Sequence, residues 1–306
     1  MEAFLNSLPG AVAQGLIWGM MAIGVYITFK VLDLADLTVD GSLATGGAVF
    51  VVLTTSGVNL YISLIVAFLA GCVAGFITGM FHTAFGIPAI LAGILTQFSL
   101  YSINLRIMGN NSNVAINFRK YNLLVTSSNI NKSLIAGAIL VALIILILYW
   151  FFGTQLGSAI RATGCNEAMA RANGINTNRN KVFGLVLSNG IVALAGALEA
   201  QYSGNADVGK GKGAIVIGLA AVIIGEVLFG KIFKNFALRL VGVALGGVIY
   251  YIVQTVVIQV GLNPNDLKLF TALFVAIFLG LPYWKSRMKP SAKKQAKKNG
   301  EVGAHA

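Results

Sequence analysis

Long apolar runs dominate this sequence and leave it few ways to fold. Each is close to the roughly 20 residues that an α-helix needs to cross a bilayer. The second and seventh runs are short and interrupted by glycine. The chain is therefore predicted to be an all-α polytopic membrane protein of about nine transmembrane helices, at residues 10–29, 41–56, 60–80, 88–108, 133–152, 182–203, 213–230, 236–260 and 267–284.

The charge content agrees with a lipid environment. Only 10% of the 306 residues are charged and 57% are hydrophobic, whereas soluble domains carry about 25% charged residues. So little charge could not solvate a globule of this size, so lipid must cover most of its surface. The net charge of +12 could suggest nucleic acid, but the basic residues lie mostly in loops and the C-terminal tail. Such basic flanks are typical of membrane proteins beside anionic lipid, and no nucleic-acid partner is expected.

Lysine and arginine divide unequally between the two sides of the predicted spans. One side holds 15 of the 22, and the other side holds seven. Basic residues favour the cytoplasmic side, which places the N-terminus outside and the C-terminus inside. The polar interval 153–181 is then inside, and 109–132 is the longest external loop. The tail, residues 286–306, is lysine-rich and is predicted to be disordered at the cytoplasmic surface.

Two parts of the chain share a pattern. In each, a span is followed by a loop of small and acidic residues, a short glycine-containing span, and a span with small residues at every fourth position. The connector span 133–152 lies between these halves, so the second half crosses the membrane in the opposite orientation to the first. This order predicts an inverted-topology repeat, with halves at 10–108 and 182–284, inside one membrane domain of residues 1–285. Chance similarity between glycine-rich helices is the alternative.

Residues suited to catalysis or metal binding are scarce. The histidines are His82 and His305, and no two acids have catalytic spacing. Asp33, Asp36 and Asp40 follow the first span in a predicted cytoplasmic loop. Three acids there are more typical of a solvated or helix-capping feature than of a cation site. Neither enzymatic activity nor a bound metal is expected.

The segment 204–210, GNADVGK, imitates a phosphate-binding loop. It matches the first seven places of G-x-x-x-x-G-K-[ST], but Gly211 stands where the hydroxyl for Mg²⁺ is needed. The charge distribution also places it outside. We therefore expect no cofactor in this chain, and any ATP and Mg²⁺ to be bound by a partner.

Several polar residues lie inside or beside the apolar runs. Such residues are costly in hydrocarbon and usually face a bundle interior or a water-filled path. For each one, an interhelical hydrogen bond is the alternative role. The candidate pathway or gate residues are Asp36, Asp40, Gln97, Asn189, Glu199, Glu226 and Gln254.

The polar interval 153–181 contains the clearest local signal. Asn166 can cap a helix, and Glu167 then lies in the first turn, where the helix dipole favours an acid. Good helix formers follow, and Gly174 can end the helix in the left-handed conformation. These residues predict a helix of about two turns. An ordinary interfacial connector would show the same pattern.

Residues 160–180, IRATGCNEAMARANGINTNRN, resemble the coupling-helix region of ABC importer permeases. The similarity rests on Glu167-Ala168 followed by Gly174-Ile175, although the helix has Glu-Ala-Met rather than Glu-Ala-Ala. Residues 36–41 and 218–226 are similar to permeases of the branched-chain amino acid and ribose group. Within that group, the chain resembles a bacterial branch linked to amino acids, including tryptophan.

The resemblance implies a permease subunit in the bacterial cell membrane. Its implied partners are cytoplasmic ABC ATPase subunits, a second permease copy in a homodimer, and an external substrate-binding protein. The substrate would be a small organic solute such as an amino acid. A secondary transporter driven by an ion gradient is the alternative, disfavoured by the large polar loop. The implied ATPase-coupling residues are Asn166, Glu167, Ala168, Met169, Ala170, Arg171, Gly174 and Ile175.

Overall fold

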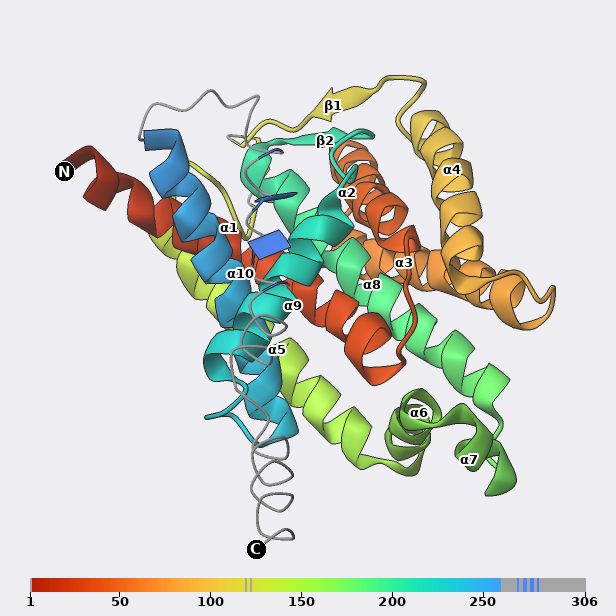
Figure 1. Cartoon of the computed structure of the whole chain (residues 1–306). Helices are drawn as coiled ribbons and strands as arrows, with labels where there is room; N and C mark the ends of the chain where they lie inside the picture. The colour runs from red at the N-terminus through yellow and green to blue at the C-terminus, as the bar shows by residue number, and fades with distance from the viewer. Residues whose placement is uncertain are drawn as a thin grey trace, which may run out of the picture.

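The computed structural model describes residues 2–259 except 119 and 122, together with residues 269, 272, 273, 276, 277 and 280. This part of the chain is almost entirely helical (Figure 1). The elements are α1 (Glu2–Tyr26), the π-helical turn η1 (Ile27–Val31), α2 (Thr38–Thr55), α3 (Leu60–Thr83), α4 (Ala89–Ile107), β1 (Asn113–Ala115), α5 (Ile130–Gly153), α6 (Gln155–Cys165), α7 (Glu167–Ala172), α8 (Thr177–Ser203), β2 (Asn205–Asp207), α9 (Ala214–Phe229) and α10 (Phe236–Gln259).

The predicted spans correspond to helices wherever the structure describes the chain. Seven of the described helices are long and apolar enough to cross a membrane. α9 is apolar but shorter, so of the eight predicted spans that the structure describes, seven are long enough to cross. The ninth predicted span, 267–284, lies almost wholly outside the described residues, as does the predicted tail 286–306.

The bundle has two distinct ends (Figure 1). At the sheet end, β1 pairs antiparallel with β2, with Val114 opposite Ala206. The opposite end, which we call the α7 end, carries α6 and α7. There, Lys30 forms an ion pair with Glu226, and Gly164 packs against the carbonyl of Val31. The loops 109–132 and 204–213, which contain these strands, therefore lie at the same end of the bundle. This agrees with the prediction that both are on one side of the membrane.

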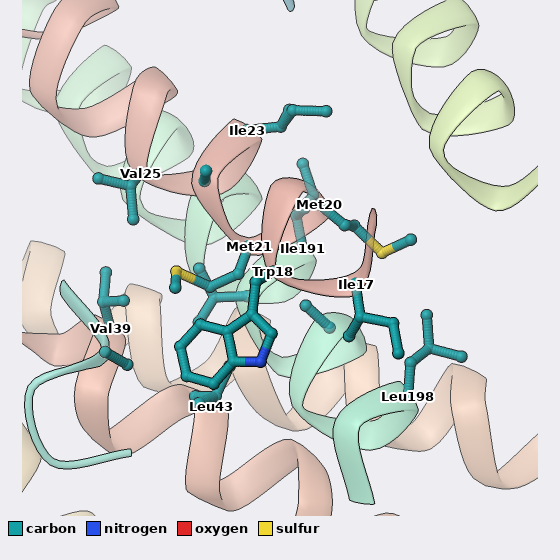
Figure 2. Close-up of a cluster of buried hydrophobic side chains, with 14 of the residues drawn as sticks. Ile17, Trp18, Met20, Met21, Ile23, Val25, Val39, Leu43, Ile191 and Leu198 are labelled. Atoms are coloured by element: carbon teal, nitrogen blue, oxygen red, sulfur yellow. The ribbon is translucent and has the colours of Figure 1, made fainter. Parts of the chain in front are cut away.

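The centre of the bundle is formed by α1, α2 and α8. These helices are largely buried, whereas most of α3, α4 and α5 is exposed. Figure 2 shows buried apolar side chains from the three central helices gathered together, including Trp18, Leu43 and Ile191. The outer helices expose large apolar side chains such as Leu69 and Leu146. Such an inside-to-outside arrangement suits a bundle surrounded by lipid.

Glycine allows the closest helix contacts. A Cβ atom on Gly75 of α3 would overlap the backbone of Leu185 in α8, and one on Gly71 would overlap Asn189. In the same way, Gly246 of α10 lies directly against Ala221 of α9. Close backbone approach through small residues is how membrane helices gain packing energy. The small residues at every fourth position of α3 and α10 therefore lie at helix–helix contacts.

Two helices, α2 and α9, begin inside the bundle. Ser42 in the first turns of α2 donates a 2.6 Å hydrogen bond to Asn189, near the middle of α8. Gly213, which precedes α9, lies beside Asp40 at the same level. From there α2 runs to the sheet end, where Tyr121 donates to the Thr55 carbonyl. α9 runs the other way and places Glu226 against Lys30.

The placement of the acids in a solvated cytoplasmic loop is therefore wrong for two of them. Asp36 and Asp40 are 2% and 8% exposed, and only Asp33 is on the surface. The segment between η1 and α2 turns back into the bundle and carries the two carboxylates with it. Their burial requires hydrogen-bond partners, and the capping role considered for these acids is the one that the structure shows.

The helix α6 was not predicted. Its buried residues, Gly157, Ile160 and Thr163, recur every third position on one face. That amphipathic pattern suits a helix lying along the α7 end of the bundle. The helix is too short and too polar to be a membrane span. Long apolar runs, from which the other helices are predicted, therefore do not indicate it.

Candidate functional site

Asp40 joins the two helices that begin inside the bundle. Its carboxylate oxygens accept hydrogen bonds from the backbone nitrogens of Gly213, at 2.8 Å, and Ile215, at 2.9 Å. The first backbone N–H groups of a helix have no partner within the helix, and an acid at that position also interacts favourably with the helix dipole. Asp40 of α2 thus caps α9 across the bundle.

Asp36 anchors a second buried network. Its carboxylate accepts the backbone N–H of Thr38 at 2.9 Å and the side-chain amide of Asn189 at 2.7 Å. The hydroxyl of Thr38 lies 2.7 Å from that of Thr78, which in turn donates to Thr96. The network ties α2 to α3, α4 and α8. Asp36 and Asn189, both predicted pathway residues, are in direct contact and have a structural role in this conformation.

A cavity lies between α2, α4 and the loop that precedes α9. Its volume is about 280 Å³. Asp40 and Gln97, two further predicted pathway residues, line it together with Tyr101, Asn104 and Lys212. We call it the α2–α4 cavity. It combines an acid, a base, an amide and an aromatic ring, which is the chemistry expected of a site for a small polar solute.

Glu226 belongs to a separate cavity at the α7 end. It forms a 3.0 Å ion pair with Lys30 of η1, and both side chains are partly exposed. The surrounding space has a volume of about 370 Å³ and is also lined by Phe229, Phe233 and Arg239. The pair thus joins α9 to η1 at the α7 end of the bundle.

The remaining two predicted pathway residues lie apart from both cavities. Glu199 of α8 is buried, accepts a 3.2 Å hydrogen bond from the Trp18 indole, and lies 3.5 Å from the Lys210 ammonium. Gln254 of α10 has a buried side-chain oxygen with no hydrogen-bond partner in the described part of the chain. The seven predicted residues therefore do not form one continuous site.

The helix predicted at Asn166–Ala172 is present as α7. Asn166 caps it by accepting the backbone N–H of Met169 at 2.9 Å. Gly174 has φ +76°, in the left-handed region that glycine adopts without strain. Glu167 accepts hydrogen bonds from Arg171 at 2.5 Å and from Lys181 of α8 at 2.9 Å. The bond from Lys181 is the main cause that lowers the pKa of Glu167.

These contacts divide α7 into an inner and an outer face. Ala170 is buried, and Glu167 is occupied by Arg171, Lys181 and the Thr177 hydroxyl. Ala168 and Met169 are exposed, the Met169 side chain by 65%. A large apolar side chain held on a short, braced helix is suited to insertion into a groove of another protein.

Sequence reasoning missed two of the residues that line the α2–α4 cavity. Tyr101 and Lys212 lie on α4 and the β2–α9 loop, far in sequence from Asp40. Neither carried a signal, because an aromatic ring and a loop lysine are common in any membrane protein. Asn104, which also lines the cavity, did carry one and is among the polar residues inside the apolar runs, where an amide is costly.

Residues 8–281 match the family described as "Branched-chain amino acid transport system / permease component". The chain belongs to this permease family. The match spans nearly the whole bundle, including both halves of the predicted repeat and α7 between them. The chain is therefore a multi-pass membrane permease of the ABC importer type.

The relatives of the permease include proteins named for tyrosine and for ribose transport. A "Tyrosine transport system permease protein" from Clostridioides difficile is 36% identical over 90% of this chain and 91% of its own length. A Rickettsia prowazekii protein, RP368, is 33% identical over 90% and 97%. The ribose import permease protein RbsC from Escherichia coli is 27% identical over 80% and 75%.

Proposed function

We propose that this permease forms the translocation path of an ABC importer for an amino acid, with ATP hydrolysis supplied by cytoplasmic ATPase subunits. The observation that carries the proposal is α7, a short helix braced by Glu167 and exposing Met169, in a chain of the permease family. The ATP and Mg²⁺ belong to the ATPase partners. A second permease copy and an external substrate-binding protein complete the assembly.

An inverted repeat gives this path its alternating access. Contacts between the halves support it, because each third helix packs through glycines on the first helix of the other half. In the first half, Gly71 and Gly75 of α3 meet α8. In the second, Gly247 of α10 meets Gly19 of α1. α2 and α9 begin at the same depth and run apart, as the broken segments of an inverted repeat do.

The α7 end faces the cytoplasm in this proposal. The greater number of lysine and arginine residues on that side supports the orientation. The N-terminus and the β1–β2 sheet are then external, where a substrate-binding protein would dock. ATPase closure would push on α7 and, through Lys181 and Thr177, on α8.

An amino acid is preferred as the substrate over a sugar. The tyrosine permease is more similar to this chain than the ribose permease, at 36% against 27% identity. The α2–α4 cavity also contains both an acid and a base. Fixed charges of both signs suit a zwitterion, whereas a neutral sugar needs mainly hydroxyl and amide partners.

Copurification tests the coupling surface. The tagged chain is expressed with its neighbouring transport genes, extracted in mild detergent and probed for an ATPase. We expect the ATPase to be retained by the wild type and lost with Met169→Glu, because a charge cannot enter an apolar groove. Ser112→Glu adds the same charge at the sheet end, where Ser112 is exposed, and should retain the ATPase.

The outcomes separate the proposal from its rival. A wild-type chain that never brings down an ATPase would refute the coupling role of α7. Uptake that continues after ATP depletion and stops when the ion gradient is collapsed would favour a secondary transporter. Equal loss of the ATPase in both variants would show a general effect of added charge and remove the assignment to Met169.

A further inference from the structure

The α2–α4 cavity contains a buried amide without a partner. Asn104 of α4 is 1% exposed, and neither its side-chain nitrogen nor its oxygen has a hydrogen-bond partner in the part of the chain that the structure describes. Native proteins bond nearly all such groups, and leaving them unbonded lowers stability. The amide lines the cavity, so a polar ligand that reaches it would recover both bonds.

Lys212, on the loop that precedes α9, provides a positive charge in the cavity lining. Its ammonium lies 5.4 Å from the centre of the Tyr101 ring, within the range of a cation–π contact. Asp40 determines where Lys212 lies, because its carboxylate holds the backbone of the next residue, Gly213. The loop cannot be displaced toward α2, since Gly211 already lies directly against the Asp40 carbonyl.

Asp40 provides the negative charge. Its two oxygens accept the backbone N–H groups of Gly213 and Ile215, but a carboxylate has about four acceptor positions. It can therefore accept further bonds from an ammonium group in the cavity. The wall contributed by α4 adds aromatic surface from Tyr101 and Phe98, with Phe98 72% exposed.

We propose that the α2–α4 cavity binds a zwitterionic aromatic amino acid within the permease, with Lys212 and the Asn104 amide holding its carboxylate. Asp40 and the Asn104 oxygen accept from its ammonium group, and Tyr101 and Phe98 contact its side chain. This inference rests on the proposed function, whose substrate class it makes specific. Asp40 acts also as a positioning residue, through its cap on α9.

The size of the cavity agrees with this ligand. Its volume of about 280 Å³ is near the lower limit of small-molecule pockets, roughly 300–1,000 Å³. An oligosaccharide or a peptide would not fit. A single metal ion is also a poor match, because the described residues contain no group of three or more His, Cys, Asp or Glu side chains able to hold one, and Lys212 would repel it.

Direct binding to the full-length permease tests the site without the other subunits. The chain is purified into lipid nanodiscs, and binding of radiolabelled L-tyrosine is measured in competition with other compounds. Tyramine lacks the carboxylate, 4-hydroxyphenylpropionate lacks the ammonium group, and D-ribose represents the sugar relatives. We expect saturable binding of L-tyrosine and competition by the two analogues that is weaker by about tenfold, since each loses a charge-assisted bond.

Two variants assign the contacts. Asn104→Leu keeps the approximate shape of the side chain and removes both unpartnered groups, so it should weaken L-tyrosine binding about tenfold without lowering thermal stability. Lys212→Met should weaken binding by a similar factor and should reduce the difference in affinity between L-tyrosine and tyramine. Lys120→Met is the control, because Lys120 lies outside the cavity beside the Tyr121 ring. This variant should bind L-tyrosine normally.

Each other outcome overturns the inference. Absence of saturable binding, competition by D-ribose as strong as by L-tyrosine, or normal binding in both variants would each contradict it. Copurification of an ATPase with the same variants, coexpressed with the other subunits, separates this result from the proposed function. A permease that retains its ATPase but fails these binding tests remains an importer subunit without this site.

Discussion

The carboxylate of Asp40 lies 2.8 Å from the backbone nitrogen of Gly213, although the two residues are 173 positions apart in the chain. The contact joins the start of α2 to the start of α9. Because α2 and α9 then run toward opposite ends of the bundle, the contact joins the two helices at the level where each begins.

Replacement of Asp40 should loosen that connection. In Asp40→Ala, the N–H groups of Gly213 and Ile215 lose their acceptors inside the bundle. Loss of a helix cap or of a buried acceptor costs about 1–3 kcal/mol. We expect a lower thermal unfolding midpoint of the purified chain in detergent. Asp33→Asn is the control, since Asp33 is exposed. Equal midpoints for Asp40→Ala and wild type would contradict the cap.

Glycine at position 75 should be essential for the packing of α3 on α8. A methyl group there would overlap the Leu185 backbone, which cannot move as a side chain can. Overpacking of this kind costs about 1–3 kcal/mol, so Gly75→Ala should lower the unfolding midpoint. Gly153→Ala is the matched control, because a Cβ at Gly153 meets nothing within 4 Å. A greater loss in Gly153→Ala would argue against the packing.

Acid should loosen α7. The pKa of Glu167 is lowered from its ordinary value of 4.5, mainly by the Lys181 hydrogen bond. A carboxyl with a lowered folded-state pKa stabilises the fold fully above its unfolded value. The contribution is lost as the pH falls through the folded value. We expect faster amide hydrogen exchange in 166–176 below about pH 4.5, after correction for intrinsic rates. Glu167→Gln should show no such pH dependence.

The Lys30–Glu226 pair should influence transport rather than assembly. Both side chains are partly exposed, so breaking the pair should cost little stability, about 0–1 kcal/mol. We expect Glu226→Gln to alter the uptake rate in a reconstituted transporter while leaving insertion and copurification unchanged. Exchanging the charges in Lys30→Glu with Glu226→Lys should restore the rate. Unchanged uptake in Glu226→Gln would show that the ion pair contributes to packing and not to transport.

Much of the architecture could be predicted because it depends on local sequence. Apolar runs specify helices wherever they are long enough to cross a bilayer. The capping signals of Asn166 and Gly174 act within a few residues of each other, so they located α7. The glycines of α3 and α10 predicted close helix contacts, because small residues at every fourth position leave room on one helix face.

The sequence by itself determined that the chain is a bundle of membrane helices with a short capped helix in its central polar interval. Only the tertiary structure placed Asp36 and Asp40 inside the bundle, since their burial depends on the segment before α2 turning back against α8. Likewise, only folding brought Lys212 beside Tyr101 and left the Asn104 amide without a partner. The physical reason is distance along the chain. Helix signals operate over a few residues, whereas a cavity is made by side chains that become neighbours only when distant helices pack.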